Sequence, residues 1–252
     1  MSLITIQQQM QDLRLMGMLN TIETDLNIAI KQGWSHEELQ SKLLQSEKDF
    51  RDEDFINKKV KAAQFKKGAT MGDFDLIVKR GITKHQVQDL MSLRWLEQAR
   101  PILFIGQTGM GKSYLAEALG RYACSQKKTV LLKEATELFI MISDARRLNR
   151  YLSIRKRLSM VDILIIDDFG MRKISSTEAQ DLKEILEMRS IAKSTIFTSQ
   201  LPLKHWNEVI EDHVILEAIV DLVEHSSILI EMKGESYRKT KAKKLDDKVL
   251  VQ

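Results

Sequence analysis

The sequence predicts an α/β fold, in which a five-stranded parallel sheet with flanking helices follows an all-helical N-terminal domain. Three observations lead to this prediction. After Pro101, short aliphatic or β-branched runs alternate with helical stretches, which is typical of strands buried on both faces of a parallel sheet. Before Pro101, apolar residues keep a helical period. A glycine-rich loop directly follows the first apolar run, where folds of this class connect a strand to a helix.

The N-terminal part is expected to form helices. Apolar residues recur near the helical period from residue 6 to residue 30, and Gly17 is expected to mark a break. Ser35-His36-Glu37-Glu38 is a capping-box pattern that predicts a second helix running towards the mid-60s. Thr83-Lys84-His85-Gln86 repeats the pattern and predicts a further helix start.

A polar, glycine-bearing stretch from Lys66 to Gly72 is typical of a linker and sets the domain boundaries. We expect a helical domain over residues 1–66, a linker and connecting helix over 67–97, and an α/β domain with a short C-terminal lid over 98–252. The strands expected in this last domain are Ile102–Ile105, Thr129–Leu132, Ile163–Ile166, Thr195–Thr198 and Ile228–Ile230.

Composition excludes several classes of protein. Of the 252 residues, 43% are hydrophobic and 29% charged, so the chain can bury a core and is not disordered as a whole. Cys124 is the only cysteine, which excludes an internal disulfide and fits a reducing cytoplasm. The sequence shows no signal-peptide pattern and no apolar run long enough for a membrane span, so a cytoplasmic location is expected. The formal net charge of +4 permits nucleic-acid binding without establishing it.

The motif Gly106-x-x-x-x-Gly111-Lys112-Ser113 carries the clearest chemistry. Its glycines let the backbone wrap a phosphate, and the amides of the following helix N-terminus stabilise the negative charge. Lys112 is expected to reach the β- and γ-phosphates of ATP, and Ser113 to hold Mg²⁺. A chance glycine turn is disfavoured because a strand precedes the motif and a helix follows it. The residues expected to contact the nucleotide are Gly106, Gln107, Thr108, Gly109, Met110, Gly111, Lys112, Ser113 and Tyr114.

A pair of carboxylates follows the third apolar run, in Ile163-Leu164-Ile165-Ile166-Asp167-Asp168. Ligands bind at the carboxyl ends of such strands, so Asp167 is expected to hold Mg²⁺ through water. Asp168 is placed to orient the attacking water as general base. Two solvated aspartates at a strand end are the alternative, and it is weakened because a phosphate loop predicts such a strand downstream.

Two other nucleotide motifs overlap this segment and are rejected. Asp168-Phe169-Gly170 matches the metal tripeptide of protein kinases, but the chain has no His-Arg-Asp catalytic loop. Asp167-Asp168-Phe169-Gly170 fits the loose Asp-x-x-Gly pattern of GTPases, but a guanine-reading Asn-Lys-x-Asp is absent. Thr198-Ser199-Gln200 ends the fourth run, and Ser199 and Gln200 are expected to sense the γ-phosphate or the attacking water. A polar strand end that enters the turn before Pro202 is the alternative.

Together these motifs resemble the IstB-like transposition helper ATPases, relatives of the DnaC helicase loader in the AAA+ group. Leu13-Arg14-Leu15-Met16-Gly17-Met18 and Trp95-Leu96-Glu97 are similar to the family's N-terminal opening and its entry to the first strand. Beyond the nucleotide motifs, Thr198-Ser199-Gln200-Leu201-Pro202 followed by Trp206 is similar to its sensor-1 region, and Gly234-Glu235-Ser236-Tyr237-Arg238 to its terminal signature. The resemblance spans almost the whole chain and implies an AAA+ sheet.

The resemblance also implies roles for arginines. Arg238 is expected to make a sensor-2 contact with nucleotide, although by sequence alone it is better explained as a surface residue of a basic tail. Where the family shows Leu-Asp-Arg-Leu, this chain has Val220-Asp221-Leu222-Val223. Leu222 thus replaces an expected arginine finger, so either another arginine such as Arg189 acts between subunits or ATP hydrolysis is slow.

A cluster of cations between the second and third runs is a candidate DNA-binding surface: Arg146, Arg147, Arg150, Arg155, Lys156 and Arg157. Such a patch would neutralise phosphates without reading bases, although from charge alone a solvated basic helix is the better explanation. In the family this region grips double-stranded DNA inside an oligomer. The resemblance therefore implies a DNA-binding ATPase that assembles as a homo-oligomer and assists the transposase of its element. The alternatives are a replicative helicase loader and, more distantly, a small-molecule P-loop kinase.

Overall fold

The computed structural model describes residues 2–74 and 81–234, and it divides the chain into two compact units between Lys58 and Lys59. The first unit holds α1 (Leu3–Asp12), α2 (Met16–Gln32) and most of α3 (His36–Ala62). The capping box forms as predicted, since the Ser35 amide donates to Glu38 Oε2 over 2.6 Å and the Glu38 amide donates to Ser35 Oγ over 3.2 Å.

Gly17 lies inside α2, and the helical break comes just before it, between the ends of α1 and α2. A side chain at this position is excluded because a Cβ would lie 2.5 Å from the Ser46 carbonyl oxygen on α3. This close approach lets Glu47 act as a cap from another helix. Glu47 Oε2 accepts hydrogen bonds from the amides of Gly17 (2.7 Å) and Met18 (3.2 Å). These amides lie in the first turn of α2, where the N-cap residue provides no side-chain hydrogen bond.

Glu47→Ala is expected to expose the first turn of α2 to exchange and to cost the N-terminal unit about 1–3 kcal/mol. Burial alone raises the pKa of Glu47, but hydrogen bonds from Arg51, Met18 and Gly17 outweigh it and lower the pKa. A depressed folded pKa gives stabilisation that is present above the unfolded value of about 4.3 and is lost as pH falls through the folded value.

Amide hydrogen exchange at Gly17 and Met18 measures this effect. Glu53→Ala is the matched control, since Glu53 is an exposed glutamate of the same helix α3. Equal exchange at the two amides in both variants at pH 7 would contradict the capping role.

The second unit contains the sheet, whose strands are β1 (Ile102–Gly106), β2 (Val130–Glu134), β3 (Ile163–Phe169), β4 (Ser194–Ser199) and β5 (Ile228–Met232). All pairs are parallel and the order is β2-β3-β4-β1-β5, which confirms the predicted five-stranded parallel sheet. The flanking helices are α4 (Lys84–Met91), α5 (Arg94–Glu97), α6 (Lys112–Ser125), α7 (Ala135–Arg147), α8 (Tyr151–Met160), α9 (Ser176–Arg189), the 3₁₀ helix η1 (Leu203–Glu208) and α10 (His213–Glu224).

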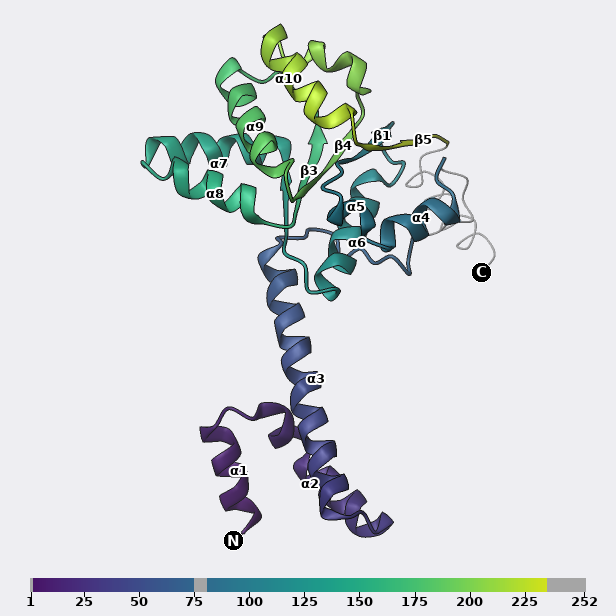
Figure 1. Cartoon of the computed structure of the whole chain (residues 1–252), viewed down its shortest axis with the longest axis vertical. Coiled ribbons are helices and arrows are strands. Elements are labelled where there is room, and N and C mark those ends of the chain that lie inside the picture. The colour runs from purple at the N-terminus through teal and green to yellow at the C-terminus, as the bar shows by residue number, and fades with distance from the viewer. Residues whose placement is uncertain (1, 75–80, 235–252) are drawn as a thin grey trace, which may run out of the picture. The chain divides into compact units, whose positions relative to one another are not determined.

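Helices cover both faces of this sheet, as the continuous apolar strands require (Figure 1). Alternate residues of one strand enter different cores: Ile163 and Ile165 pack with α6, whereas Leu164 and Ile166 pack with α7 and α9. The core on the side of α7 and α9 includes an aromatic group around Trp206, which is fully buried. Within the described ranges, no helix has the length and apolarity that crossing a bilayer requires.

Candidate functional site

The loop between β1 and α6 is shaped by its glycines. At Gly106 a Cβ would lie 2.2 Å from the Met232 carbonyl oxygen, so the strand can end against β5 only without a side chain. Gly111 caps α6 with φ 95°, a left-handed conformation that favours glycine. The free amides of the first turn of α6 therefore open onto the loop, which is the geometry of an anion site.

Lys112 is buried at the centre of this loop. Its Nζ donates hydrogen bonds to the carbonyl oxygens of Gly106 (2.7 Å) and Gln107 (3.0 Å). Burial lowers the pKa of Lys112, while the negative charges of Asp168 and Asp167 act to raise it. The ammonium thus lies within electrostatic reach of both carboxylates at the end of β3.

Asp167 and Asp168 occupy an irregular stretch of β3. The β3–β4 register shifts between Ile166 and Phe169, and Asp168 has a positive φ of 53°. This breaks the alternation of a regular strand, in which successive side chains point to opposite faces. Burial, followed by the charge of Asp167, raises the pKa of Asp168. A raised pKa makes this carboxylate a better proton acceptor at neutral pH.

Thr198 is a site residue that the sequence interpretation missed. Its hydroxyl donates to Asp167 Oδ1 over 2.6 Å and accepts from the Asp168 amide over 2.9 Å, so one side chain of β4 fixes both aspartates. The available signal was a threonine at the end of a strand expected to be buried, because a fully buried hydroxyl needs a partner.

Ser199, which is expected to act as a sensor, lies buried at the end of β4. Its buried hydroxyl donates to the Phe169 carbonyl oxygen (2.7 Å) and accepts from the Leu201 amide (2.9 Å), which ties the ends of β3 and β4 together. Gln200 is exposed, contacts Met171 and lines a cavity of about 320 Å³ that also borders the phosphate loop.

The side chains present fit a magnesium ion bound together with phosphates. Ser113 lies half-buried in the first turn of α6, and Asp167 offers a carboxylate at the end of β3. Mg²⁺ is usually held by one or two such oxygens plus substrate phosphates. The described residues contain no cluster of three or more acidic, histidine or cysteine side chains that could hold a metal alone.

Residues 65–74, here called the linker segment, lie against α6 through contacts that the sequence did not reveal. Glu117 is 1% exposed and accepts hydrogen bonds from the amides of Lys66, Lys67 and Ala69, at 3.0, 2.9 and 3.2 Å. Tyr114, expected to contact nucleotide, places its hydroxyl 3.4 Å from both the amide and the carbonyl oxygen of Thr70. The side chain of Tyr114 is thus engaged by the linker segment.

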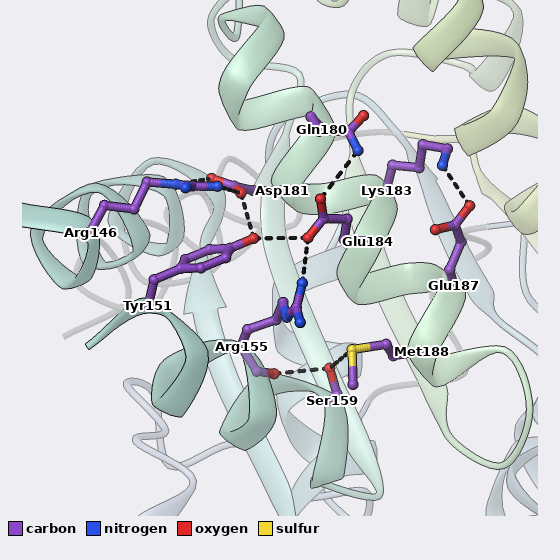
Figure 2. A network of polar contacts seen from close by, with 10 residues as sticks. All are labelled: Arg146, Tyr151, Arg155, Ser159, Gln180, Asp181, Lys183, Glu184, Glu187 and Met188. Carbon is purple, nitrogen blue, oxygen red and sulfur yellow. Dashed lines mark hydrogen bonds and ion pairs between the residues drawn. The ribbon is translucent and has the colours of Figure 1, made fainter. Parts of the chain in front are cut away.

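Two of the six cations proposed for DNA binding are held by acids of α9 (Figure 2). Arg146 hydrogen-bonds both carboxylate oxygens of Asp181, and Arg155 Nη1 donates to Glu184 Oε2 over 2.6 Å. Tyr151 bridges the two acids at 2.7 and 3.1 Å, and the Arg146 guanidinium lies 3.8 Å from its ring centroid. These two arginines therefore fasten α7 and α8 to α9.

The remaining four cations are exposed. Arg147 pairs with Asp144 on its own helix. Arg150, Lys156 and Arg157 have no acidic partner in the part of the chain that the structure describes. These three residues are the ones whose charge remains available to a ligand.

Arg189, suggested as a trans-acting arginine, is buried, and the position expected to hold a finger arginine is Leu222. Leu222 packs against the core as a partly buried side chain of α10. Arg189 is 1% exposed and donates to the carbonyl oxygens of Leu158 (2.6 Å) and Val161 (2.9 Å), so it cannot reach another subunit. This corrects the suggestion that Arg189 acts between subunits. Arg238 lies outside the described residues.

Comparison with known proteins shows the family to which the chain is similar. The family described as IstB-like ATP binding protein matches residues 8–245. An insertion sequence ATP-binding protein of Sinorhizobium fredii, y4pL, is 32% identical over 230 residues, which make up 91% of this chain and 94% of the relative. The ATP-binding protein of insertion sequence IS232 from Bacillus thuringiensis is 31% identical over 226 residues, or 90% of each chain.

Solved structures share the fold. DnaI aligns with a TM-score of 0.55 and 20% identity over 66% of this chain and 92% of its own. AMPPCP-bound DnaA from Aquifex aeolicus aligns with a TM-score of 0.59 and 18% identity over 73% of this chain and 56% of its own. These likenesses confirm the expected fold, a parallel sheet with flanking helices. With its family match and its close sequence relatives, the chain belongs to the IstB-like ATP-binding proteins.

Proposed function

We propose that this chain binds and hydrolyses ATP with Mg²⁺, assembles on double-stranded DNA as a homo-oligomer, and recruits or stimulates the transposase of an insertion sequence. The observation that carries the proposal is the convergence of Lys112, Asp167, Asp168 and Thr198 at the carboxyl ends of neighbouring strands. Family membership supports it, since the relatives above are ATP-binding proteins of insertion sequences.

In the proposed reaction, the amides of the phosphate loop and Lys112 bind the phosphates of ATP. Ser113 and Asp167 hold Mg²⁺, which neutralises phosphate charge when bound. Asp168 accepts the proton of the attacking water, and Thr198 keeps both aspartates in place. Hydrolysis by one copy is slow, because the position expected to supply an arginine finger holds Leu222 packed in the core.

The proposed assembly couples nucleotide to oligomer state. ATP bound between copies stabilises the assembled form by mass action, and hydrolysis then acts as a timer. In this proposal residues 1–66 carry contacts to DNA and partner, and residues 98–252 form the ATPase domain. Arg238, through a sensor-2 contact, and Gln200, at the cavity beside the loop, are proposed to touch the nucleotide.

DNA binding is expected to depend on Arg150, Lys156 and Arg157. The triple variant Arg150→Gln, Lys156→Gln, Arg157→Gln is expected to weaken binding to duplex DNA on the order of tenfold or more. It should also reduce the slope of log affinity against log salt by up to about 3, since each lost phosphate contact removes about one counterion released. Fluorescence anisotropy over a range of salt concentrations gives both values.

The matched control is the triple variant Lys173→Gln, Lys183→Gln, Lys204→Gln, which removes three cations elsewhere in the same unit. It is expected to keep the wild-type salt slope. If both triple variants lowered the slope equally, binding would depend on overall charge and not on this patch.

Sedimentation of the full chain with ATP, Mg²⁺ and duplex DNA tests the assembly, and failure to form a DNA-bound oligomer would refute it. Pull-down with the integrase-like transposase of the adjacent reading frame, beside a replicative hexameric helicase, tests the partner. Preferential capture of the helicase would favour a helicase loader, whose fold DnaI shares. Phosphate transfer to a metabolite without stimulation by DNA would favour a small-molecule kinase.

A further inference from the structure

The linker segment runs along α6 in the direction of the phosphate loop. The Phe65 ring lies against Gly120, where a Cβ would be 3.0 Å from Phe65 Cε1. Further on, Thr70 meets the hydroxyl of Tyr114. Since Tyr114 precedes Gly120 by more than a helical turn, the segment passes α6 from its C-terminal part towards its N-terminus. Residues between Phe65 and Thr70 therefore approach the first turn of α6, which carries Lys112.

Glu117 holds this part of the linker segment by its backbone. Burial raises the pKa of Glu117, but hydrogen bonds from the amides of Lys66, Lys67 and Ala69 and from Arg121 outweigh it and lower the pKa. The carboxylate is thus ionised at neutral pH, and charge-assisted bonds to three amides fix the segment. Because the clamp uses only backbone groups, the side chains of the two lysines stay free to act elsewhere.

Lys66 and Lys67 act in different places. Lys66 Nζ pairs with Glu137 Oε1 at 2.9 Å and with Glu134 Oε2 at 3.5 Å. Lys67 is exposed, and no acid among the described residues forms an ion pair with it. Glu117 holds the Lys67 amide against α6 at 2.9 Å, in the segment that approaches the first turn of this helix, so the Lys67 ammonium is available to an anion bound there.

We propose that Lys67 is a second phosphate-binding lysine, which contacts the γ-phosphate of bound ATP from the linker segment, and that Glu117 is the residue that positions it. This proposal rests on the ATP site proposed above and deepens it. The γ-phosphate is the group that fits, because Asp168 stands where the attacking water is expected. An unpaired ammonium beside an anion site of this kind forms a charge-assisted hydrogen bond with a phosphate oxygen.

Isothermal titration calorimetry of the full chain with Mg²⁺ and either AMPPCP or ADP tests the proposal. Lys67→Ala is expected to weaken AMPPCP binding about tenfold, the worth of one charge-assisted bond, and to change ADP binding less than about threefold. Lys67→Arg keeps the cation and is expected to retain most of the affinity for AMPPCP. Lys66→Ala is the matched control, which leaves both affinities at the wild-type values.

A double-mutant cycle tests the role of Glu117. Glu117→Gln is expected to weaken AMPPCP binding in the wild-type background and to have little further effect in Lys67→Ala. Equal losses for AMPPCP and ADP in Lys67→Ala, or no loss for either, would overturn the role of Lys67 while leaving the ATP site intact. If the wild-type chain bound neither nucleotide, the proposed function itself would fail.

Discussion

Lys112→Ala is expected to abolish measurable nucleotide binding, a loss of at least about a hundredfold in affinity, and with it the nucleotide-dependent assembly. The reason is electrostatic. The Lys112 ammonium is the buried cation that lies between the loop carbonyl oxygens and the carboxylates of Asp167 and Asp168. Without it, phosphates would meet two acids with little positive charge to offset them.

Calorimetry with AMPPCP and sedimentation with DNA measure the two consequences of this substitution. Lys128→Ala is the control, since Lys128 follows the opposite end of α6. A melting curve unchanged from the wild type would show that Lys112→Ala acts on the site and not on the fold. Assembly at the wild-type level in Lys112→Ala would remove the phosphate loop from the mechanism.

Arg189→Met is expected to be the most destabilising single substitution among those discussed, with a loss of about 3 kcal/mol or more. The guanidinium donates to the carbonyl oxygens of Leu158, Val161, Asp162 and Ser194 and, through Nε, to Thr195 Oγ1. Burial lowers the pKa of Arg189 to about 9, so the group remains charged at neutral pH. Methionine fills much of the volume but leaves these acceptors without donors.

Thermal unfolding measures this cost, and for a unit of this size we expect Tm to fall by roughly 6–12 °C. Arg172→Met is the control, because Arg172 makes an ion pair with Glu178 near the surface, and such pairs contribute about 1 kcal/mol or less. Equal Tm shifts in the two variants would show that the carbonyl oxygens around Arg189 find water as a substitute.

The fold and the core of the site were predictable because their signals are local. The strand runs, the glycine spacing before Lys112 and the capping box at Ser35 depend on residues a few positions apart. The consecutive acids after Ile166 were equally visible, since a parallel sheet gathers the carboxyl ends of its strands.

The contacts that the sequence did not reveal depend on partners that are distant in the chain. In the sequence, Arg146 and Arg150 are both arginines of the same basic cluster. The fold brings Asp181 to Arg146, whereas no acid of the described chain pairs with Arg150. The sequence likewise could not distinguish Thr198 from Ser199, because the pairing of β3 with β4, in which Ile166 lies opposite Phe197, decides which hydroxyl reaches Asp167. Glu117 gave no signal, since its partners are backbone amides and not side chains.

The strand order has a consequence for how the chain folds as it is synthesised. Among the described strands, β1 pairs only with β4 and β5, both of which follow it in the sequence, whereas β2 and β3 pair with each other as soon as both have emerged. The apolar strand that leads into the phosphate loop therefore waits, without neighbours, until Ser194–Ser199 leaves the ribosome. Unpaired apolar strands are prone to aggregate, so we expect Ile102–Gly106 to be exposed to aggregation until β4 has been made.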